Sequence, residues 1–577
     1  MSTTYTIGID FGTESGRAVL VDAGDGREIA SAVHPYARGV IDERLPDAGV
    51  TLPPDWALQD PKDYLAVFQR AVPAALRQSG VDPAQVRGVG IDFTSCTMLP
   101  TTRDGTPLCD LPQWRQQPHA WVKLWKHHAA QPQADRINQV ARARGERWLA
   151  RYGGKYSAEW FFSKALQILD EAPEVYAAAD RLIEAADWVV WRLTGQETRN
   201  LCTAGYKALW QDGAFPDPAF FAALHPGMAD IVATRMRSDL APLGARAGGL
   251  TAEAAAWTGL PEGTPVAVAN VDAHVTAAAV QAVEPGVFVL IMGTSTCDIL
   301  LGRELREVEG MCGVVRDGVV AGSYAYEAGQ NGVGDIFAWY AQQAAPPQAH
   351  AAAQAAGLAL QPYLEREAAR LQPGESGLLA LDWWLGNRST LVNTDLTGLL
   401  LGLTVSTTPP ETYRALIEAT AFGARTIIDA FERGGVPIHT LVAAGGLPEK
   451  NALLTQIYAD VTGRPLYLAG SAQAPALGSA IHAAVAAGLY PDIPAASRAM
   501  GSRRPEPVAP NPAAHAIYDQ LYADYTALYD YFGRGDNDVM RRLKRLRAQA
   551  KIPPLPSPPG GEVGGGGAPA ISPEGGE

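Results

Sequence analysis

The segment IGIDFGTESGRAVLV, residues 7–21, decides the fold because it places a polar, glycine-containing turn between two apolar runs. Such a pattern predicts a β-hairpin. Glycine lets backbone N–H groups approach an anion closely, and Thr13 and Ser15 add hydroxyl donors. Asp10 ends the first run, and a carboxylate with water suits Mg²⁺. A single turn of this kind is more often a capped β-turn than a phosphate site.

A second turn of the same kind lies in VFVLIMGTSTCDILL, residues 287–301. Gly293 and Thr294 take the places of Gly12 and Thr13, about half the chain further on. We interpret the recurrence as an internal duplication of two related halves rather than a short solenoid repeat. Two hydroxyl-rich hairpins that face each other predict a two-sided phosphate clamp.

The segments that follow each hairpin indicate an α/β fold. In the first half a helical period over 61–80 precedes a buried strand over 86–94, and a further apolar strand over 263–274 ends in polar residues. In the second half a helix over 410–435 precedes a strand over 439–446. This order predicts a sheet with helices on its faces in each half.

The length of 577 residues requires at least two domains. We predict an N-terminal domain over 1–283 and a C-terminal domain over 284–550, divided at Glu-Pro-Gly. Residues 551–577 are rich in proline and glycine and are predicted to be disordered. The Ala/Gln-rich segment 341–372 is predicted to be helical, as a lid or as an oligomer face, and a homodimer remains open.

Composition excludes several classes of protein. A net charge of −14 without a basic run argues against nucleic-acid binding. No apolar stretch is long enough to span a membrane, and the first residues lack an apolar signal core. The five cysteines form no CxxC pair, which favours a reduced, cytoplasmic protein.

A third motif, Gly445-Gly446, stands between an apolar strand and a helix start in LVAAGGLPEKNALLTQIYADVTGRPL, residues 441–466. The glycines expose a backbone surface for a base or ribose, beside helix N-terminal amides. A lone pair of glycines is weak evidence. Together with both hairpins it indicates a nucleotide site.

These motifs resemble those of the FGGY carbohydrate kinases, members of the actin-like ATPase superfamily, over nearly all of residues 5–545. GIDFGTESGRA and IMGTSTC resemble the two phosphate motifs, and AAGGLPEKNALL resembles the adenosine motif. Residues 163–195 are similar to the N-terminal signature. The resemblance implies two actin-like (ribonuclease H-like) domains facing a central cleft, with ATP as donor and Mg²⁺ as cofactor.

Within the family, several segments are similar to those of L-ribulokinases, which implies L-ribulose as the acceptor and its 5-phosphate as the product. They are GIDFTSCTMLP (90–100), CTAGYKALW (202–210), NVDAHV (270–275), YEAGQNGVGD (326–335) and DWWLGNRS (382–389). Another pentulose or a pentitol, such as D-ribulose or ribitol, is the alternative acceptor. A nucleotide-driven switch of the actin or Hsp70 type is the alternative function.

The resemblance also implies roles for individual residues. Asp272 matches the catalytic base, with a helix N-cap as the alternative interpretation, and Asp10 matches the metal ligand. The residues that match the sugar pocket are Ser95, Trp125, Lys207, Asp272 and Glu327. Those that match the nucleotide site are Gly12, Thr13, Arg17, Gly293, Thr294, Gly334, Gly445, Gly446 and Asn451. For Trp125 the alternative is a core aromatic, and for Lys207 and Arg17 a surface charge.

Overall fold

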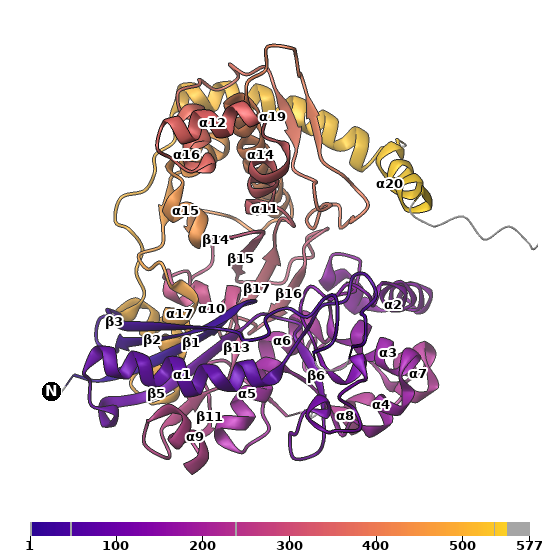
Figure 1. The fold of residues 1–577 in the computed structure, drawn as a ribbon, viewed down its shortest axis with the longest axis vertical. Coiled ribbons are helices and arrows are strands. Elements are labelled where there is room, and N and C mark those ends of the chain that lie inside the picture. The colour runs from indigo at the N-terminus through magenta and orange to yellow at the C-terminus, as the bar shows by residue number, and fades with distance from the viewer. Residues whose placement is uncertain (1–2, 47–48, 237–238, 536, 551–577) are drawn as a thin grey trace, which may run out of the picture.

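Two mixed β-sheets, one from each half of the chain, form the centre of the molecule (Figure 1). The structure is a computed structural model, which describes residues 3–46, 49–236, 239–535 and 537–550. The predicted disorder of 551–577 concerns residues outside this part of the chain. No helix among the described residues is long and apolar enough to cross a membrane. All five cysteines are described, and each is a free thiol.

The first sheet has the strand order β11-β12-β5-β1-β2-β3. Its strands are β1 (Tyr5–Phe11), β2 (Ser15–Asp22), β3 (Glu28–Pro35), β5 (Val86–Phe93), β11 (Arg246–Gly249) and β12 (Pro265–Ala267), with β13 (Asn270–Val271) also paired to β5. β1 is antiparallel to β2 and parallel to β5. Helix α1 (Pro61–Ser79) packs on one face, where Tyr64, Val67 and Phe68 are fully buried.

The second sheet repeats this topology, with the order β16-β17-β15-β14-β20-β21. Its strands are β14 (Val287–Met292), β15 (Thr296–Gly302), β16 (Gly313–Arg316), β17 (Tyr324–Ala328), β20 (Thr440–Ala444) and β21 (Leu466–Leu468). β14 is antiparallel to β15 and parallel to β20, as β1 is to β2 and β5. The predicted duplication and the α/β fold class are thereby confirmed. Around the core formed on this sheet lie α14 (Pro409–Arg433), α16 (Ala452–Thr462) and α19 (Pro512–Gly533).

Two helices, α10 (Asp272–Ala279) and α17 (Ala474–Ala486), pack against each other where the two halves meet. α17 comes late in the chain but covers β1 and β5 of the first sheet (Figure 1). Glycines permit this approach, because a Cβ on Gly8 would lie 1.7 Å from the carbonyl oxygen of Ala476, and one on Gly90 1.9 Å from that of Ser479. A segment from the C-terminal half therefore completes the core of the first sheet. The boundary between residues 283 and 284 stays a prediction.

The region between β5 and β12 is mainly helical. Its helices include α2 (Gln131–Arg144), α3 (Phe161–Glu171), α4 (Pro173–Ala178), α5 (Ala185–Thr194), α6 (Leu201–Lys207), α7 (Pro218–Leu224), α8 (Ile231–Arg235) and α9 (Ala252–Thr258). They accompany a small sheet of β4 (Leu58–Gln59), β7 (Val122–Lys123), β6 (Met98–Thr101) and β8 (Arg181–Glu184), and a two-stranded sheet of β9 (Arg199–Asn200) and β10 (Leu240–Ala241).

Local sequence is not enough to predict every element in this half. Residues 181–184 form β8, because Leu182 and Ile183 are buried in pairing with β6. The strand expected over 263–274 is two short strands, and helix α10 begins at Asp272.

The remaining elements lie mostly in the second half. They are α11 (Gly334–Trp339), α12 (Pro347–Ala355), α13 (Leu360–Ala368), β18 (Leu379–Leu381), β19 (Leu399–Leu401), α15 (Gly446–Lys450), α18 (Ile493–Met500) and α20 (Val539–Ala550). α12 and α13 confirm the helical prediction for 341–372, and α13 packs on α14.

Candidate active site

A cavity of about 440 Å³ takes side chains from both halves of the chain. Its size is typical of small-ligand sites, which span roughly 300–1,000 Å³. The predicted site residues that line it are Asp10, Thr13, Ser95, Trp125, Lys207, Asp272, Gly293, Thr294 and Glu327. The predicted residues that do not line it are Gly12, Arg17, Gly334, Gly445, Gly446 and Asn451. The structure therefore brings the predicted sugar-side residues together with the two hairpins.

The first hairpin turns directly after β1. The Gly12 amide donates to the Ser15 carbonyl oxygen (3.0 Å). Thr13 anchors the turn on both sides, since its carbonyl accepts from Gln59 Nε2 (2.7 Å) and its hydroxyl accepts from Trp125 Nε1 (3.1 Å). Trp125 is therefore not a plain core aromatic: its ring lines the cavity while its N–H positions the turn.

The second hairpin is built in the same way. The Gly293 amide donates to the Ser295 carbonyl oxygen (2.9 Å), and a Cβ on Gly293 would meet only that oxygen, at 3.9 Å. The Gly334 amide donates to the Gly293 carbonyl oxygen (3.1 Å), so Gly334 supports the turn from behind. The surface over the turn is open to a ligand, and its exposed backbone suits phosphate oxygens.

The Gly445-Gly446 motif adjoins the second hairpin. A Cβ on Gly445 would lie 2.4 Å from the Met292 carbonyl oxygen, and its φ of 99° is one that L-residues rarely adopt. A Cβ on Gly446 would meet nothing within 4 Å. Asn451 caps α16 by accepting from the Leu454 amide (2.9 Å) and donates to Glu365 (2.9 Å), so its side chain also has a structural role.

Three carboxylates gather where β1, β5 and α10 meet. Asp10 lies opposite Asp92 in the register of β1 and β5. Burial raises the pKa of Asp10, although the charge of Arg17, its neighbour across to β2, opposes the shift. Asp92 was missed by sequence reasoning; it is fully buried, accepts from the Ser479 hydroxyl (2.6 Å), and its pKa is raised by burial and by Asp10.

Asp272 is the first residue of α10, and its Oδ1 accepts from the Ala273 amide (2.7 Å). Burial raises its pKa to about 7, and the charges of Asp10 and Glu327 act in the same direction. A carboxyl group with this pKa exchanges its proton near neutral pH, as a general base requires. The helix-start alternative is partly correct, but it does not remove Asp272 from the cavity.

The residues present fit a divalent cation bound together with phosphate. A nearby positive charge stabilises the ionised form of carboxylates whose pKa values are raised by burial. No preformed cluster of three or more metal-ligating side chains exists among the described residues. Mg²⁺ commonly takes one or two carboxylates, with water and phosphate oxygens completing its shell, and Asp10 is placed for that role.

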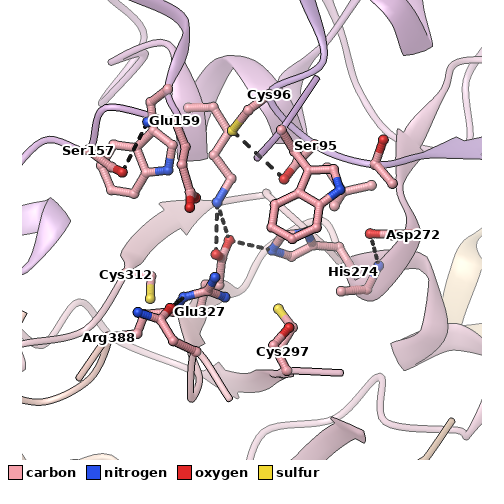
Figure 2. A pocket seen from close by; sticks show the side chains of 18 of the residues that line it. Ser95, Cys96, Ser157, Glu159, Asp272, His274, Cys297, Cys312, Glu327 and Arg388 are labelled. Carbon is pink, nitrogen blue, oxygen red and sulfur yellow. Dashed lines mark hydrogen bonds and ion pairs between the residues drawn. The ribbon is translucent and has the colours of Figure 1, made fainter. Parts of the chain in front are cut away.

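A buried ion pair crosses the cavity between the two halves (Figure 2). Lys207 Nζ donates to both carboxylate oxygens of Glu327 (2.8 Å each), and both side chains are less than a tenth exposed. Burial acts to raise the pKa of Glu327, but Lys207 and His274 together outweigh burial and hold the pKa below its usual range. Lys207 is thus not a surface lysine. Buried pairs add little net stability, which favours a functional reason for this one.

His274, also missed from the sequence, completes this group. Its Nε2 lies 3.2 Å from Glu327, in a geometry that is not aligned as a hydrogen bond, and its ring lies against that of Tyr206 (4.4 Å between centroids). Burial lowers its pKa, so the ring is neutral. Its position two residues after Asp272, on the first turn of α10, is the sequence feature that could have indicated a place in the site.

Other cavity residues carried no sequence signal that singled them out: Cys96, Glu159, Cys297, Cys312 and Arg388. They lie around the Lys207–Glu327 pair in Figure 2. Burial raises the pKa of each thiol, to about 12 for Cys96 and about 11 for Cys312, so none of the three is a reactive thiolate.

The FGGY family of carbohydrate kinases matches this chain in both halves, the N-terminal domain over residues 5–279 and the C-terminal domain over residues 288–487. The chain belongs to the FGGY family of carbohydrate kinases. Membership agrees with the duplicated sheets and with a cavity between them, and it implies ATP as the phosphoryl donor.

Curated FGGY relatives match nearly the whole chain. A protein named Ribulokinase from Geobacillus thermodenitrificans (strain NG80-2) is 57% identical over 557 residues, which cover 96% of this chain and 98% of the relative. The Ribulokinase of Mycolicibacterium smegmatis is 56% identical over 548 residues, or 95% and 97% of the two chains.

Solved FGGY structures share the fold at lower identity. The xylulose kinase from Rhodospirillum rubrum superposes with a TM-score of 0.71 at 24% identity and covers 91% of this chain and 98% of its own. The gluconate kinase from Lactobacillus acidophilus gives a TM-score of 0.74 at 19% identity, with coverage of 92% and 98%. These two structures therefore share the fold of this chain.

Proposed function

We propose that this chain transfers the γ-phosphoryl group of ATP to L-ribulose and forms L-ribulose 5-phosphate. The observation that carries the proposal is the buried Lys207–Glu327 pair together with Asp272 in a cavity shared with both hairpins. An ATPase switch needs no acceptor site beside the phosphates. The relatives named Ribulokinase, more than half identical over nearly the full length, support ribulose as the acceptor.

Phosphoryl transfer to a sugar hydroxyl requires positioning, charge neutralisation and removal of a proton. In our proposal the backbone amides of the Gly12 and Gly293 turns hold the phosphates from two sides, with Gly446 beside the nucleoside. Asp10 would hold Mg²⁺, which supplies positive charge to the phosphate oxygens. Asp272 accepts the proton of the attacking hydroxyl and keeps it until the product leaves.

The acceptor is read by charged and aromatic groups. Lys207 donates hydrogen bonds and Glu327 accepts them. A sugar hydroxyl beside the pair can therefore accept from Lys207 and donate to Glu327. Trp125 forms an apolar wall, and Ser95 also lines the cavity. A wrong epimer leaves a buried polar group unpaired, which penalises it strongly.

A coupled assay of ADP release tests the proposal. L-ribulose is expected to stimulate ADP formation well above the rate without sugar, and D-ribulose, ribitol and other pentuloses serve as the comparison panel. ADP release that no sugar stimulates would leave the switch as the function. Preference for ribitol or D-ribulose would retain the kinase and replace the acceptor. Chelation of Mg²⁺ with EDTA is expected to abolish the activity, and added MgCl₂ to restore it.

A further inference from the structure

Arg388 is a cavity residue to which the proposed reaction gives no role. It lies between β18 and β19, in the second half of the chain. Its Nε donates to Asn331 Oδ1 (2.9 Å), and Asn331 in turn donates to the Leu385 carbonyl oxygen (2.9 Å). Among the described residues this is the one hydrogen bond of the Arg388 side chain. The guanidinium is therefore held in one orientation, with both Nη groups left for a ligand.

The backbone around Arg388 is equally fixed. Asn387 and Asn393 exchange two backbone hydrogen bonds (2.9 and 2.8 Å). On the other side of Arg388, Ser389 accepts from the Gly329 amide (3.3 Å), and Thr390 is hydrogen-bonded to the Tyr529 hydroxyl (2.8 Å). Because Arg388 is already held in place beside the cavity, it loses little conformational entropy when a ligand binds.

Two acidic groups of the cavity, Glu159 and Glu327, act on the charge of Arg388. Burial acts to lower its pKa, but the negative charges around it, that of Glu159 first among them, together outweigh burial, so the guanidinium stays charged. Glu159, on the opposite wall, is held by His128 (2.8 Å). No ion pair joins Glu159 to Arg388 within the described part of the chain, so space remains between them.

Glu327 lies between Arg388 and the carboxylate that takes the proton. In Figure 2 the Glu327 side chain stands between Asp272 on one side and Arg388 on the other, and all three line the same cavity. An acceptor whose terminal hydroxyl reaches Asp272 therefore extends past Glu327 toward Arg388 (Figure 2).

We propose that Arg388 binds the end of the ketopentose that does not react, with its two Nη groups donating to the oxygen atoms on C1 and C2. The inference rests on the proposed function, because it takes ribulose as the acceptor. The planar guanidinium offers two parallel donors at fixed spacing, which a lysine cannot reproduce. Arg388 is thus a specificity-determining residue contributed by the second half of the chain.

The test measures steady-state constants of Arg388→Gln, Arg388→Lys and the exposed control Arg306→Gln. Arg388→Gln is expected to raise KM for L-ribulose roughly 10- to 100-fold, the range for lost hydrogen bonds to a charged group, and to leave KM for ATP within about twofold. Arg388→Lys should give an intermediate value and Arg306→Gln no change. Calorimetric titration with L-ribulose in the absence of ATP should show the same order.

A second sugar identifies the atom that is bound. The sugar 1-deoxyribulose lacks O1 and should have a higher KM than ribulose with the unchanged protein. It should have little further effect in Arg388→Gln, because the deoxysugar and the substitution remove the same contact. The inference would be overturned if the effects of the deoxysugar and of Arg388→Gln on KM were additive. It would also be overturned if Arg388→Gln changed only KM for ATP or only kcat, which would place Arg388 at the phosphates. If the unchanged protein shows no L-ribulose-dependent ADP release, the proposed function fails, which is a separate result.

Discussion

At the scale of single residues, the charged groups around the cavity are the feature that costs most folding free energy, because burial removes them from water. Asp92 and the Lys207–Glu327 pair are buried and Asp272 is partly buried, and burial raises the pKa of both aspartates. Desolvation offsets most of the attraction within such groups. They are therefore better explained by the chemistry of the cavity than by stability, and substitutions among them should separate activity from folding.

Asp272→Asn keeps the shape of the side chain but cannot accept the proton. We expect kcat to fall about 10²- to 10⁴-fold, the usual contribution of a general base, with little change in KM for ATP. Asp25→Asn, at an exposed turn, is the matched control. The coupled ADP assay measures both, and full turnover by Asp272→Asn would remove this residue from the mechanism.

The pKa of Asp272 also predicts two dependences on pH. Since the base acts when deprotonated, kcat/KM should rise tenfold per unit toward pH 7 and level off above it. Because the folded-state pKa is raised above that of the unfolded chain, Asp272 lowers stability as pH rises from about 4 to about 7. Asp272→Asn should therefore unfold at a higher urea concentration than the unchanged protein at pH 8, and an equal or lower midpoint would contradict the assigned pKa.

At the scale of elements, glycines decide where segments approach one another. Gly8 on β1 and Gly446 at the start of α15 are opposite cases. A Cβ at Gly8 would overlap the backbone of α17, whereas a Cβ at Gly446 would enter open space beside the second hairpin. The first glycine serves packing, and the second is placed to serve a ligand.

Gly8→Ala is expected to lower the free energy of unfolding by more than about 2 kcal/mol, because α17 must move away from β1. Gly446→Ala should leave stability unchanged and raise KM for ATP severalfold. Urea denaturation and steady-state kinetics on both variants check the pair. Loss of stability in Gly446→Ala, or none in Gly8→Ala, would reverse these assignments.

Local patterns were enough to predict both hairpins, α1, α14 and the duplication, because apolar periodicity and glycine turns act over short distances. The sequence could not predict β8, whose Leu182 and Ile183 become a strand only by pairing with β6. Lys207 and Glu327 were assigned to the site by resemblance to the family, and the structure joins them in an ion pair. Asp92, Glu159 and Arg388 were missed, since their roles depend on partners far away in the chain.

At the scale of the whole molecule, the cavity is lined from both halves, so movement of one half changes every distance across it. Closure would exclude water, which competes with the sugar for the phosphoryl group. We expect the radius of gyration from small-angle X-ray scattering to decrease when L-ribulose and a non-hydrolysable ATP analogue are both present. Either ligand alone is the control, and an unchanged radius with both would mean that no such closure occurs.

The placement of α17 has a consequence for biosynthesis. β1 and β5 leave the ribosome long before α17, the helix that covers them, is translated. Until then one apolar side of this sheet is bare, and nascent chains in that condition are prone to aggregate and are clients for chaperones. Separate expression of residues 1–283 should accordingly yield insoluble material, and co-expression of the missing part in trans should rescue it.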